Sequence, residues 1–539
     1  MSDFDVRRLL LIPEIVGLDA RSSLVRIPPE LDVPLTPRVR RLVDSRVFRR
    51  LTRVSQLGFV RLVYPGATHS RFEHSLGVYR VALLILKRLA HDERFAALVR
   101  PEEAEILILA ALLHDVGHFP FCHLLEDLKL PGLIPHEEAA ASYLLGELAP
   151  TIRADWNVDP ADVCAVLSKS PPTRRPDDSD AEFSRRSTVF RLLASVLSGP
   201  IDVDKTDYLL RDSCAAGVPY GKNYDVERLI GSVCLNERGD GIAISTKGKT
   251  AAELMVFARY VMFSEVYWHH ASRSATVMFQ RAVDLIAQDV PTERLIADFR
   301  RLSDAEIASY LLRLARPSNS PSTPQTVDSA NSANIANTAN SADFAATSPF
   351  ASTAQFSVDA PLDDAGFNDF ADFTDFNDEA ASLPPADARR RDARRLLLGL
   401  FGPERRLFKR VRQFSVMEEP ALYPRLAGRP YSELREISER FATALGVPGR
   451  LLVDAPPADK EVEFKIDVFY PEENVYRPLA TVSPVVRALA QEQFDDYVKR
   501  VRVFAAPEVA ATLRLLPDFN ARFARAVDEF EADARPNDR

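Results

Sequence analysis

The segment 106–118, with the sequence ILILAALLHDVGH, places the strongest constraint on how this chain folds. Its uninterrupted apolar run predicts a buried helix, and that helix ends in two adjacent polar residues, His114 and Asp115. Burying such groups without partners costs several kcal/mol. A divalent cation compensates both groups, because neutral imidazole and carboxylate together suit Zn, Mn, Fe or Ni. The segment therefore predicts a buried helix that presents metal ligands.

Two further segments carry candidate ligands. His74 precedes the amphipathic stretch 75–90, so it is predicted to lie near the start of a helix. In the segment 201–213, polar residues recur at i, i+4, i+7 and i+8, so that one helical face is directed towards a polar ligand. The residues of this face are Asp204, Tyr208, Arg211 and Asp212.

A lone His-Asp dipeptide is more often a hydrogen-bonded surface or capping pair than a pair of metal ligands. By itself the dipeptide is therefore a weak signal of a metal site. A His, a His-Asp pair and a distant Asp, each embedded in apolar helical sequence, have few structural explanations. The combined set of His74, His114, Asp115 and Asp204 therefore predicts a metal centre.

The charge balance disfavours some functions. The chain of 539 residues has 68 Lys plus Arg against 77 Asp plus Glu, a formal charge of −9, which is unfavourable for tracking a nucleic-acid backbone over the whole surface. A small polyanion held in a local basic pocket with metal ions fits better. The four cysteines lie far apart, and no apolar run approaches about 18 residues, so we expect neither disulfides nor a membrane span. The first twenty residues show neither the basic start nor the small-residue cleavage site typical of a signal peptide, so we expect a cytoplasmic protein.

Composition divides the chain into four parts. We predict an N-terminal segment 1–42, a helical domain 43–315, a disordered Ser/Asn/Ala- and Asp/Phe-rich insertion 316–388, and a small α+β region 389–539. The fold class is therefore mainly α with a C-terminal α+β unit. Within the helical domain, the residues 239–245 indicate a short hairpin.

The insertion cannot bury enough apolar surface to offset its ordering entropy. Its segment 359–379 repeats Phe every three residues among Asp residues, a pattern that could dock into a basic, apolar groove of a protein partner. A solvated spacer with accidental regularity explains the same composition.

Taken together, these motifs resemble the HD-domain superfamily, whose signature is H…HD…D, and within it the deoxynucleoside triphosphate triphosphohydrolases. The likeness runs through 56–78, 112–123 and 201–213 and extends to the tail segment 482–491. It implies an HD-domain helical core, a divalent metal ion (Mn, Mg, Fe, Zn or Ni), a nucleotide substrate and assembly into a homo-oligomer, a dimer or tetramer.

The resemblance also implies residue roles. The metal ligands are His74, His114, Asp115 and Asp204. The catalytic residues are Asp204 and the histidines of the reaction centre, His118, His123 and His136, one of which could protonate the leaving oxygen. Phosphate and sugar contacts are Arg71, Lys205 and Tyr208, while Gln56 and Asp212 hold the sugar 3′-hydroxyl. Ordinary helix packing is the alternative explanation for Gln56 and Tyr208.

The pattern departs from the family in two places. An Arg that reaches the triphosphate has no aligned counterpart in the stretch 263–273, where Arg273 or His270 could substitute. Asp44 matches a residue that reads a guanine effector, but Arg49 and Thr52 replace its usual partners, which disfavours activation by a guanine nucleotide.

The leading hypothesis is thus a metal-dependent enzyme that hydrolyses deoxynucleoside triphosphates to deoxynucleoside and triphosphate. One alternative is an HD phosphohydrolase acting on nucleoside monophosphates, cyclic nucleotides or modified nucleotides. Another is a nucleotide-sensing or nucleic-acid-binding scaffold with a vestigial metal site, against which the complete ligand set argues.

Overall fold

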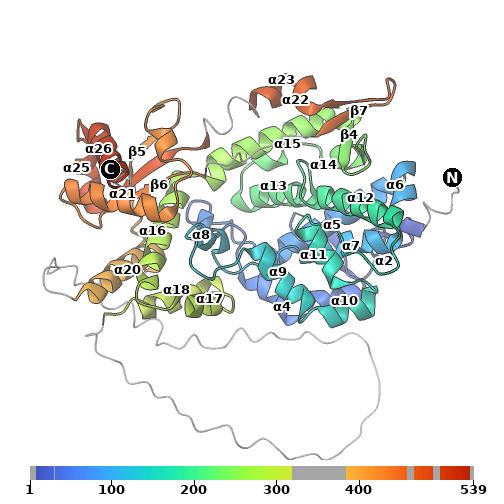
Figure 1. Ribbon diagram of the computed structural model, residues 1–539, viewed down its shortest axis with the longest axis horizontal. Helices are drawn as coiled ribbons and strands as arrows, with labels where there is room; N and C mark the ends of the chain where they lie inside the picture. The colour runs from blue at the N-terminus through green and yellow to red at the C-terminus, as the bar shows by residue number, and fades with distance from the viewer. Residues whose placement is uncertain (1–7, 30, 318–383, 458–465, 490–497, 535–539) are drawn as a thin grey trace, which may run out of the picture.

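The computed structural model describes residues 8–29, 31–317, 384–457, 466–489 and 498–534. These residues are mainly helical, with three small sheets, which confirms the predicted fold class (Figure 1). The predicted disordered insertion 316–388 lies almost entirely outside the described residues, and its Asp/Phe segment 359–379 lies wholly outside them.

The N-terminal part packs directly on the helical core. Its buried residues Leu9, Ile12 and Ile15 belong to the same hydrophobic cluster as the long apolar helix predicted above. An antiparallel hairpin follows, and the hydroxyl of Tyr79 donates a hydrogen bond to its Pro34 carbonyl over 3.1 Å. The elements are α2 (Pro13–Gly17), β1 (Leu24–Ile27), β2 (Leu31–Pro34), α3 (Pro37–Val43), α4 (Arg46–Arg49), η1 (Arg50–Arg53) and η2 (Gly58–Leu62).

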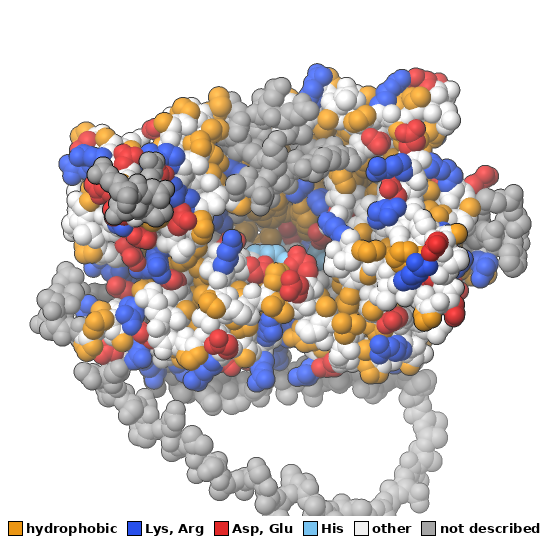
Figure 2. Space-filling model, in the orientation of Figure 1, with side chains coloured by type: hydrophobic (Ala, Val, Ile, Leu, Met, Phe, Trp, Pro, Cys, Tyr) orange, Lys and Arg blue, Asp and Glu red, His pale blue; other side chains and the backbone are white. Residues whose placement is uncertain are grey.

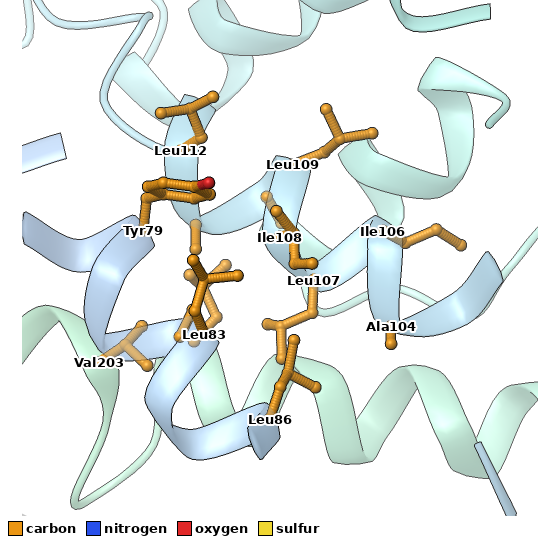
Figure 3. Packing of buried hydrophobic residues seen from close by; sticks show 14 of the residues in the cluster. Tyr79, Leu83, Leu86, Ala104, Ile106, Leu107, Ile108, Leu109, Leu112 and Val203 are labelled. Atoms are coloured by element: carbon orange, nitrogen blue, oxygen red, sulfur yellow. The ribbon is translucent and has the colours of Figure 1, made fainter. Parts of the chain in front are cut away.

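The core is built around α5 (Arg71–Leu89) and α7 (Pro101–Leu113), which pack against each other. Every residue from Ile106 to Leu113 is at most 4 % exposed, so the C-terminal part of α7 is buried on all sides. Figure 3 shows side chains of both helices packed together, among them Leu83, Leu86 and Ile108. Each such side chain contributes about 1.5–3 kcal/mol by leaving water. This packing fixes the helix ends that carry the candidate ligands.

Local signals set where the helices begin. A capping box starts α5, because the backbone N–H of Ser70 donates to the Glu73 carboxylate over 2.8 Å. Asp202 caps α13 (Val203–Ala216) by accepting from the Lys205 backbone N–H over 2.7 Å, and Gly217, with φ 72°, ends that helix. The remaining helices of this half are α6 (Glu93–Leu98), α8 (Cys122–Glu126), α9 (His136–Leu145), α10 (Ala149–Trp156), α11 (Pro160–Leu167) and α12 (Asp180–Leu197).

The predicted hairpin is present, but it belongs to a larger sheet. Strands β3 (Val233–Leu235) and β4 (Ile242–Ser245) pair antiparallel, and β4 then pairs in parallel with β7 (Asp467–Tyr470), which pairs with β8 (Val475–Pro478). Strand β7 therefore adds to a sheet begun more than two hundred residues earlier in the chain. The strands of the C-terminal α+β region therefore belong to two different sheets.

A three-stranded sheet of order β5-β9-β6 forms the other part, from β5 (Lys409–Phe414), β6 (Leu451–Asp454) and β9 (Val501–Ala505). Helix α20 (Pro385–Phe401) packs along α16 (His270–Ala287) and joins this part to the core (Figure 1). The chain ends in two helices, α25 (Pro507–Arg514) and α26 (Phe519–Ala534), which Pro517 separates.

The remaining elements complete the described chain. They are η3 (Tyr220–Lys222), α14 (Val226–Ser232), η4 (Thr246–Gly248), α15 (Lys249–Met262), the π-helical turn η5 (Phe263–Tyr267), α17 (Thr292–Phe299), α18 (Asp304–Leu314), η7 (Tyr423–Arg425), α21 (Tyr431–Ala444), α22 (Leu479–Val482) and α23 (Pro484–Arg487). Within the described ranges, no helix combines the length and apolarity that crossing a bilayer needs.

Candidate active site

Three helices bring the four predicted metal ligands together. His74 lies in the first turns of α5, His114 caps the C-terminus of α7 with Asp115 directly after it, and Asp204 lies in the first turn of α13. The Nε2 atom of His74 lies 3.0 Å from Oδ1 of Asp204 and 3.3 Å from Nε2 of His114. Nε2 of His114 lies 3.4 Å from Oδ1 of Asp115. The donor atoms therefore converge on one small space.

The outer ring nitrogens show that this space fits a cation. Nδ1 of His74 lies 2.9 Å from Oδ2 of Asp207, and Nδ1 of His114 lies 2.9 Å from the Ala111 carbonyl oxygen. Each Nδ1–H can donate to its acceptor, which leaves each Nε2 lone pair facing the shared space. Two imidazoles and two carboxylates suit a divalent transition-metal ion.

The acidic surroundings favour positive charge at this point. Burial lowers the pKa of His74, but its hydrogen bonds with Asp204 and Asp207 outweigh burial and raise that pKa to about 10. A metal ion that binds the Nε2 atom must displace this proton, so metal affinity should increase with pH.

Asp207 was not among the predicted site residues. Its carboxylate is buried and accepts two hydrogen bonds from Arg211, from Nε and from Nη2, each over 2.8 Å. The sequence interpretation had placed Arg211 on a face directed towards a ligand; instead, Arg211 holds the carboxylate behind His74. Gly77 makes room for this pair, since a Cβ there would lie 1.8 Å from Oδ1 of Asp207. An acid followed by Arg at i+4 was the available signal.

A second cluster, which we call the histidine cluster, contains His118, His123, His136 and Glu126. Nε2 of His118 lies 3.3 Å from Nε2 of His123, and the rings of His118 and His136 are tilted by 40° with centroids 3.9 Å apart. Glu126 lies 3.0 Å from Nδ1 of His136 and 3.4 Å from Nδ1 of His123. Burial raises the pKa of Glu126, but hydrogen bonds with His123 and His136 outweigh it and lower that pKa.

Ring spacings in both clusters are compatible with an ion. Two imidazoles that point at one ion, with metal–nitrogen distances of about 2 Å, keep their centroids roughly 5 Å apart. The His74 and His114 rings have this spacing, 5.2 Å, and the His123 ring lies 5.1 Å from that of His118 and 4.9 Å from that of His136. The histidine cluster can therefore serve proton transfer, hydrogen bonding to an anion or a second ion, and Asp115 joins it to the metal ligands through Nδ1 of His118 at 3.0 Å.

The loop between the two clusters is held from outside. Arg50, another residue that the sequence did not reveal, donates hydrogen bonds from Nη1 to the His118 carbonyl and from Nη2 to the Val116 carbonyl, over 2.5 and 2.6 Å. Gly117 lets α9 approach closely, because a Cβ there would lie 1.9 Å from the His136 carbonyl oxygen. This close approach brings His136 to the cluster.

A pocket of about 190 Å³ opens beside both clusters. Its lining includes eight residues with polar or charged side chains: Ser55, Gln56, Arg71, His123, Tyr267, Ser272, Arg273 and Thr276. Arg71 also donates from Nη1 to Oδ2 of Asp115 over 2.9 Å, which links the pocket to the metal ligands. The Oε1 atom of Gln56 is buried and has no hydrogen-bond partner among the described residues. Figure 2 shows histidine side chains at the floor of a hollow in this face.

The other predicted substrate contacts are already engaged within the protein. Lys205 donates from Nζ to Oδ2 of Asp202 over 2.5 Å and to the Gly199 carbonyl over 3.0 Å. Asp212 lies 2.8 Å from Nε2 of His69 and accepts a hydrogen bond from the Tyr267 hydroxyl over 2.7 Å. Asp212 therefore reaches the pocket through Tyr267.

Besides Arg71, the pocket lining contains a second arginine, Arg273, and a further arginine, Arg259, lies near Tyr208 of α13. Arg273 lines the pocket and is held by Asp454, to which Nε donates over 3.0 Å, whereas His270 lines a different pocket. Arg259 of α15 lies over the Phe263 ring and near Tyr208: burial raises the pKa of that phenol, and Arg259 opposes the shift. Arg259 lies before the stretch 263–273, and the sequence interpretation did not include it.

Similarities to known protein families and proteins agree with a metal site of this kind. Residues 71–164 match the family described as HD domain, and residues 224–323 and 384–515 match the family described as HD associated region. The chain is 36% identical over 246 residues to the YwfO protein of Bacillus subtilis, covering 44% of this chain and 50% of that one. It is 27% identical over 280 residues to the deoxynucleoside triphosphate triphosphohydrolase SAMHD1 of Homo sapiens, covering 48% and 44%. The matches thus span about half the length of these relatives.

Two solved structures share the fold over nearly the whole chain. A hypothetical protein from Aquifex aeolicus aligns with a TM-score of 0.58 and 22% identity, covering 91% of this chain and 98% of that one. A phosphohydrolase from Bacteroides thetaiotaomicron aligns with a TM-score of 0.58 and 20% identity, covering 90% and 100%. At this identity the likeness establishes the architecture alone.

Proposed function

Because the chain carries an HD domain and an HD associated region, we propose that it is a metal-dependent phosphohydrolase that converts deoxynucleoside triphosphates into deoxynucleosides and triphosphate. One observation carries the proposal: Asp115 joins a set of metal ligands to the histidine cluster, beside a pocket that contains Arg71. The matches to deoxynucleoside triphosphate triphosphohydrolases favour this substrate class.

The metal ligands are His74, His114, Asp115 and Asp204. These four residues would hold a divalent ion, whose chemistry would be to acidify a water molecule and to offset charge on the phosphoryl oxygens. The residues around the ion have separate tasks. Asp207 and the Ala111 carbonyl fix the imidazole orientations, so that the donor atoms are arranged before the ion arrives.

The triphosphate is bound by guanidinium groups. Arg71 lies between the pocket and Asp115, which places its charge beside the α-phosphoryl group in our proposal. Arg273, which is held by Asp454, lines the same pocket. It substitutes for the family's triphosphate-binding arginine, which has no aligned counterpart in the stretch 263–273. Charge-assisted hydrogen bonds of this kind are roughly twice as strong as neutral ones. Lys205 and Tyr208 of α13 do not line this pocket, and Asp202 holds the Lys205 ammonium group, so their predicted phosphate and sugar contacts would require rearrangement on binding.

The leaving group is the 5′-oxygen of the deoxynucleoside, and it needs a proton when the bond to phosphorus breaks. His123 is the member of the histidine cluster that can supply it, because its side chain is 58% exposed whereas that of His118 is 3% exposed. Glu126 faces Nδ1 of His123, which leaves Nε2, 3.3 Å from Nε2 of His118, as the nitrogen that we propose donates the proton. His118 and His136 hold the ring in place.

The sugar is recognised at the inner end of the pocket. The unpaired Oε1 atom of Gln56 can accept a hydrogen bond from the 3′-hydroxyl, and leaving it unpaired costs free energy without a ligand. Tyr267, held by Asp212, lies beside it along the pocket wall. The predicted role of Asp212 is therefore proposed to act through Tyr267.

A panel of nucleotides tests the substrate class. Purified protein with Mn²⁺ or Mg²⁺ is incubated with deoxynucleoside triphosphates, ribonucleoside triphosphates, monophosphates and cyclic nucleotides, and the products are separated by ion-exchange chromatography. We expect inorganic triphosphate and deoxynucleoside from the first group. Hydrolysis of monophosphates or cyclic nucleotides alone would instead support the alternative HD phosphohydrolase, and no hydrolysis by metal-loaded protein would support a binding scaffold.

Assembly and location remain part of the proposal. We propose a homo-oligomer acting in the cytoplasm, as the resemblance implies, and light scattering of the purified chain measures its mass directly. The Asp/Phe segment 359–379 remains a predicted docking motif; hydrolysis should survive its deletion.

A further inference from the structure

Phe121 has an unusual backbone conformation for its residue type. Its φ of 54° and ψ of 28° lie in the left-handed region, which is unfavourable for a bulky side chain. Among the described non-glycine residues with positive φ, it alone is buried, at 7% exposure. The others are the exposed residues Ser23, Lys129, Asn157, Lys169 and Asn474. Strain of this kind persists only where the surroundings determine it.

Three aromatic rings surround that of Phe121, and we call the four residues the phenylalanine cluster: Phe59, Phe121, Phe279 and Phe401. The Phe121 ring is stacked on that of Phe59 with centroids 4.7 Å apart, and its centroid lies 4.8 Å from that of Phe279. Phe401, the last residue of α20, lies 6.2 Å away. The cluster thus holds the ring through residues of η2, α16 and α20, and α16 packs against both of the other elements. Figure 1 shows α16 alongside α20.

The backbone at Phe121 decides where α8 begins. The Phe121 carbonyl accepts the first hydrogen bond of this helix, from the Leu125 N–H over 3.1 Å. The helix carries His123 and Glu126. The left-handed residue reverses the chain, so that His123 returns to within 3.3 Å of His118, measured between Nε2 atoms, only five residues later. An extended residue at this position would direct α8 away from the histidine cluster.

We propose that Phe121 is a positioning residue, whose ring is held by the phenylalanine cluster and whose left-handed backbone thereby places His123 at the leaving oxygen. The inference rests on the proposed function, in which His123 donates the proton. It adds that the C-terminal end of α20 supports the reaction centre through Phe401.

Paired substitutions separate a backbone role from a packing role. Glycine adopts positive φ at little cost and alanine does not, so we expect Phe121→Gly to keep a kcat roughly fivefold above that of Phe121→Ala. The KM and the bound metal should be equal in the two variants. A residue that serves only to fill space predicts the reverse order, because alanine buries more apolar surface; a kcat for Phe121→Ala equal to or above that for Phe121→Gly would overturn the proposal.

The matched control is Phe441, a fully buried residue within helix α21. There alanine should be more stable than glycine, as is usual inside helices. If Phe121→Ala fails to fold, Phe121→Asn and Phe121→Val make the same comparison, because Asn tolerates the left-handed region and a β-branched residue does not. The Asn variant should then have the higher kcat, and equal values would count against the proposal.

A readout independent of activity is the NMR signal of the His123 ring, assigned by its loss in His123→Gln. We expect this signal to stay near its wild-type position in Phe121→Gly and to move towards that of a free imidazole in Phe121→Ala. An unmoved signal in both variants would overturn the positioning of His123, even for an active enzyme. If the signal moves as expected while wild-type protein releases no triphosphate, the positioning stands and the proposed reaction fails.

Discussion

The Oδ2 atom of Asp207 lies 2.9 Å from Nδ1 of His74. This contact fixes which ring nitrogen faces the metal site, and Arg211 in turn fixes the carboxylate. The substitution Asp207→Asn should lower metal affinity about 10–100-fold, as for other partners of metal-bound imidazoles, while excess metal restores hydrolysis. Titration of metal-depleted protein with Mn²⁺ measures this. The control is Asp162→Asn, a buried carboxylate paired with Arg186 elsewhere, which should alter stability alone. Unchanged metal affinity in Asp207→Asn would contradict the role given to this pair.

Gly77 provides a steric test of the same arrangement. Because a Cβ there would lie 1.8 Å from Oδ1 of Asp207 and 2.4 Å from Nη2 of Arg211, Gly77→Ala must displace the pair. We expect a loss of about 1–3 kcal/mol in the free energy of unfolding, together with weaker metal binding. Chemical denaturation and metal titration measure the two effects. Gly231→Ala is the control, since no atom lies within 4 Å of a Cβ there in helix α14; it should not destabilise the protein.

The histidine cluster should make the free energy of unfolding depend on pH. Burial raises the pKa of Glu126, but the hydrogen bonds of Glu126 with His123 and His136 lower it in the folded state, so the unfolded chain binds the proton more readily. The resulting stabilisation is present above the ordinary glutamate pKa, about 4.3, and is lost as pH falls through and below that value. Melting curves of wild type and Glu126→Gln should therefore differ most near neutral pH and converge towards pH 3. Curves that keep a constant separation would show that Glu126 is not held in this way.

Arg273 distinguishes a triphosphate site from a site for smaller nucleotides. Removing a charge-assisted hydrogen bond costs about 1.5–3 kcal/mol, so Arg273→Gln should raise the KM for a deoxynucleoside triphosphate by roughly tenfold or more. Steady-state kinetics measure the effect. Arg435→Gln serves as the control, because Arg435 pairs with Asp284 away from the pocket and should leave KM unchanged. Equal KM values in both variants would remove Arg273 from the binding site.

The sequence was sufficient for features with a local cause. The apolar run of α7 could only be a buried helix, and the polar residues at its end, with His74 and Asp204, were found to converge. Alternating apolar residues predicted the hairpin around β4. The parallel pairing of β4 with β7 was not predictable, because nothing local specifies a partner strand so distant in the chain.

The parts of the site that were missed have non-local causes. Asp207 with Arg211 looks like an ordinary i,i+4 pair until burial places it behind His74. Lys205 was expected at a phosphate, but the nearby cap residue Asp202 takes its ammonium group. Phe121 gives no sequence signal at all, because a bulky aromatic residue is among the last expected at positive φ.

The most direct test of the proposed reaction is hydrolysis of a deoxynucleoside triphosphate in ¹⁸O-labelled water, with mass spectrometry of both products. If water attacks the α-phosphorus at the metal site, one ¹⁸O appears in the released triphosphate and none in the deoxynucleoside. The reaction should require metal and vanish in Asp204→Ala. Label in the deoxynucleoside, release of pyrophosphate with a monophosphate, or undiminished turnover by Asp204→Ala would contradict the account.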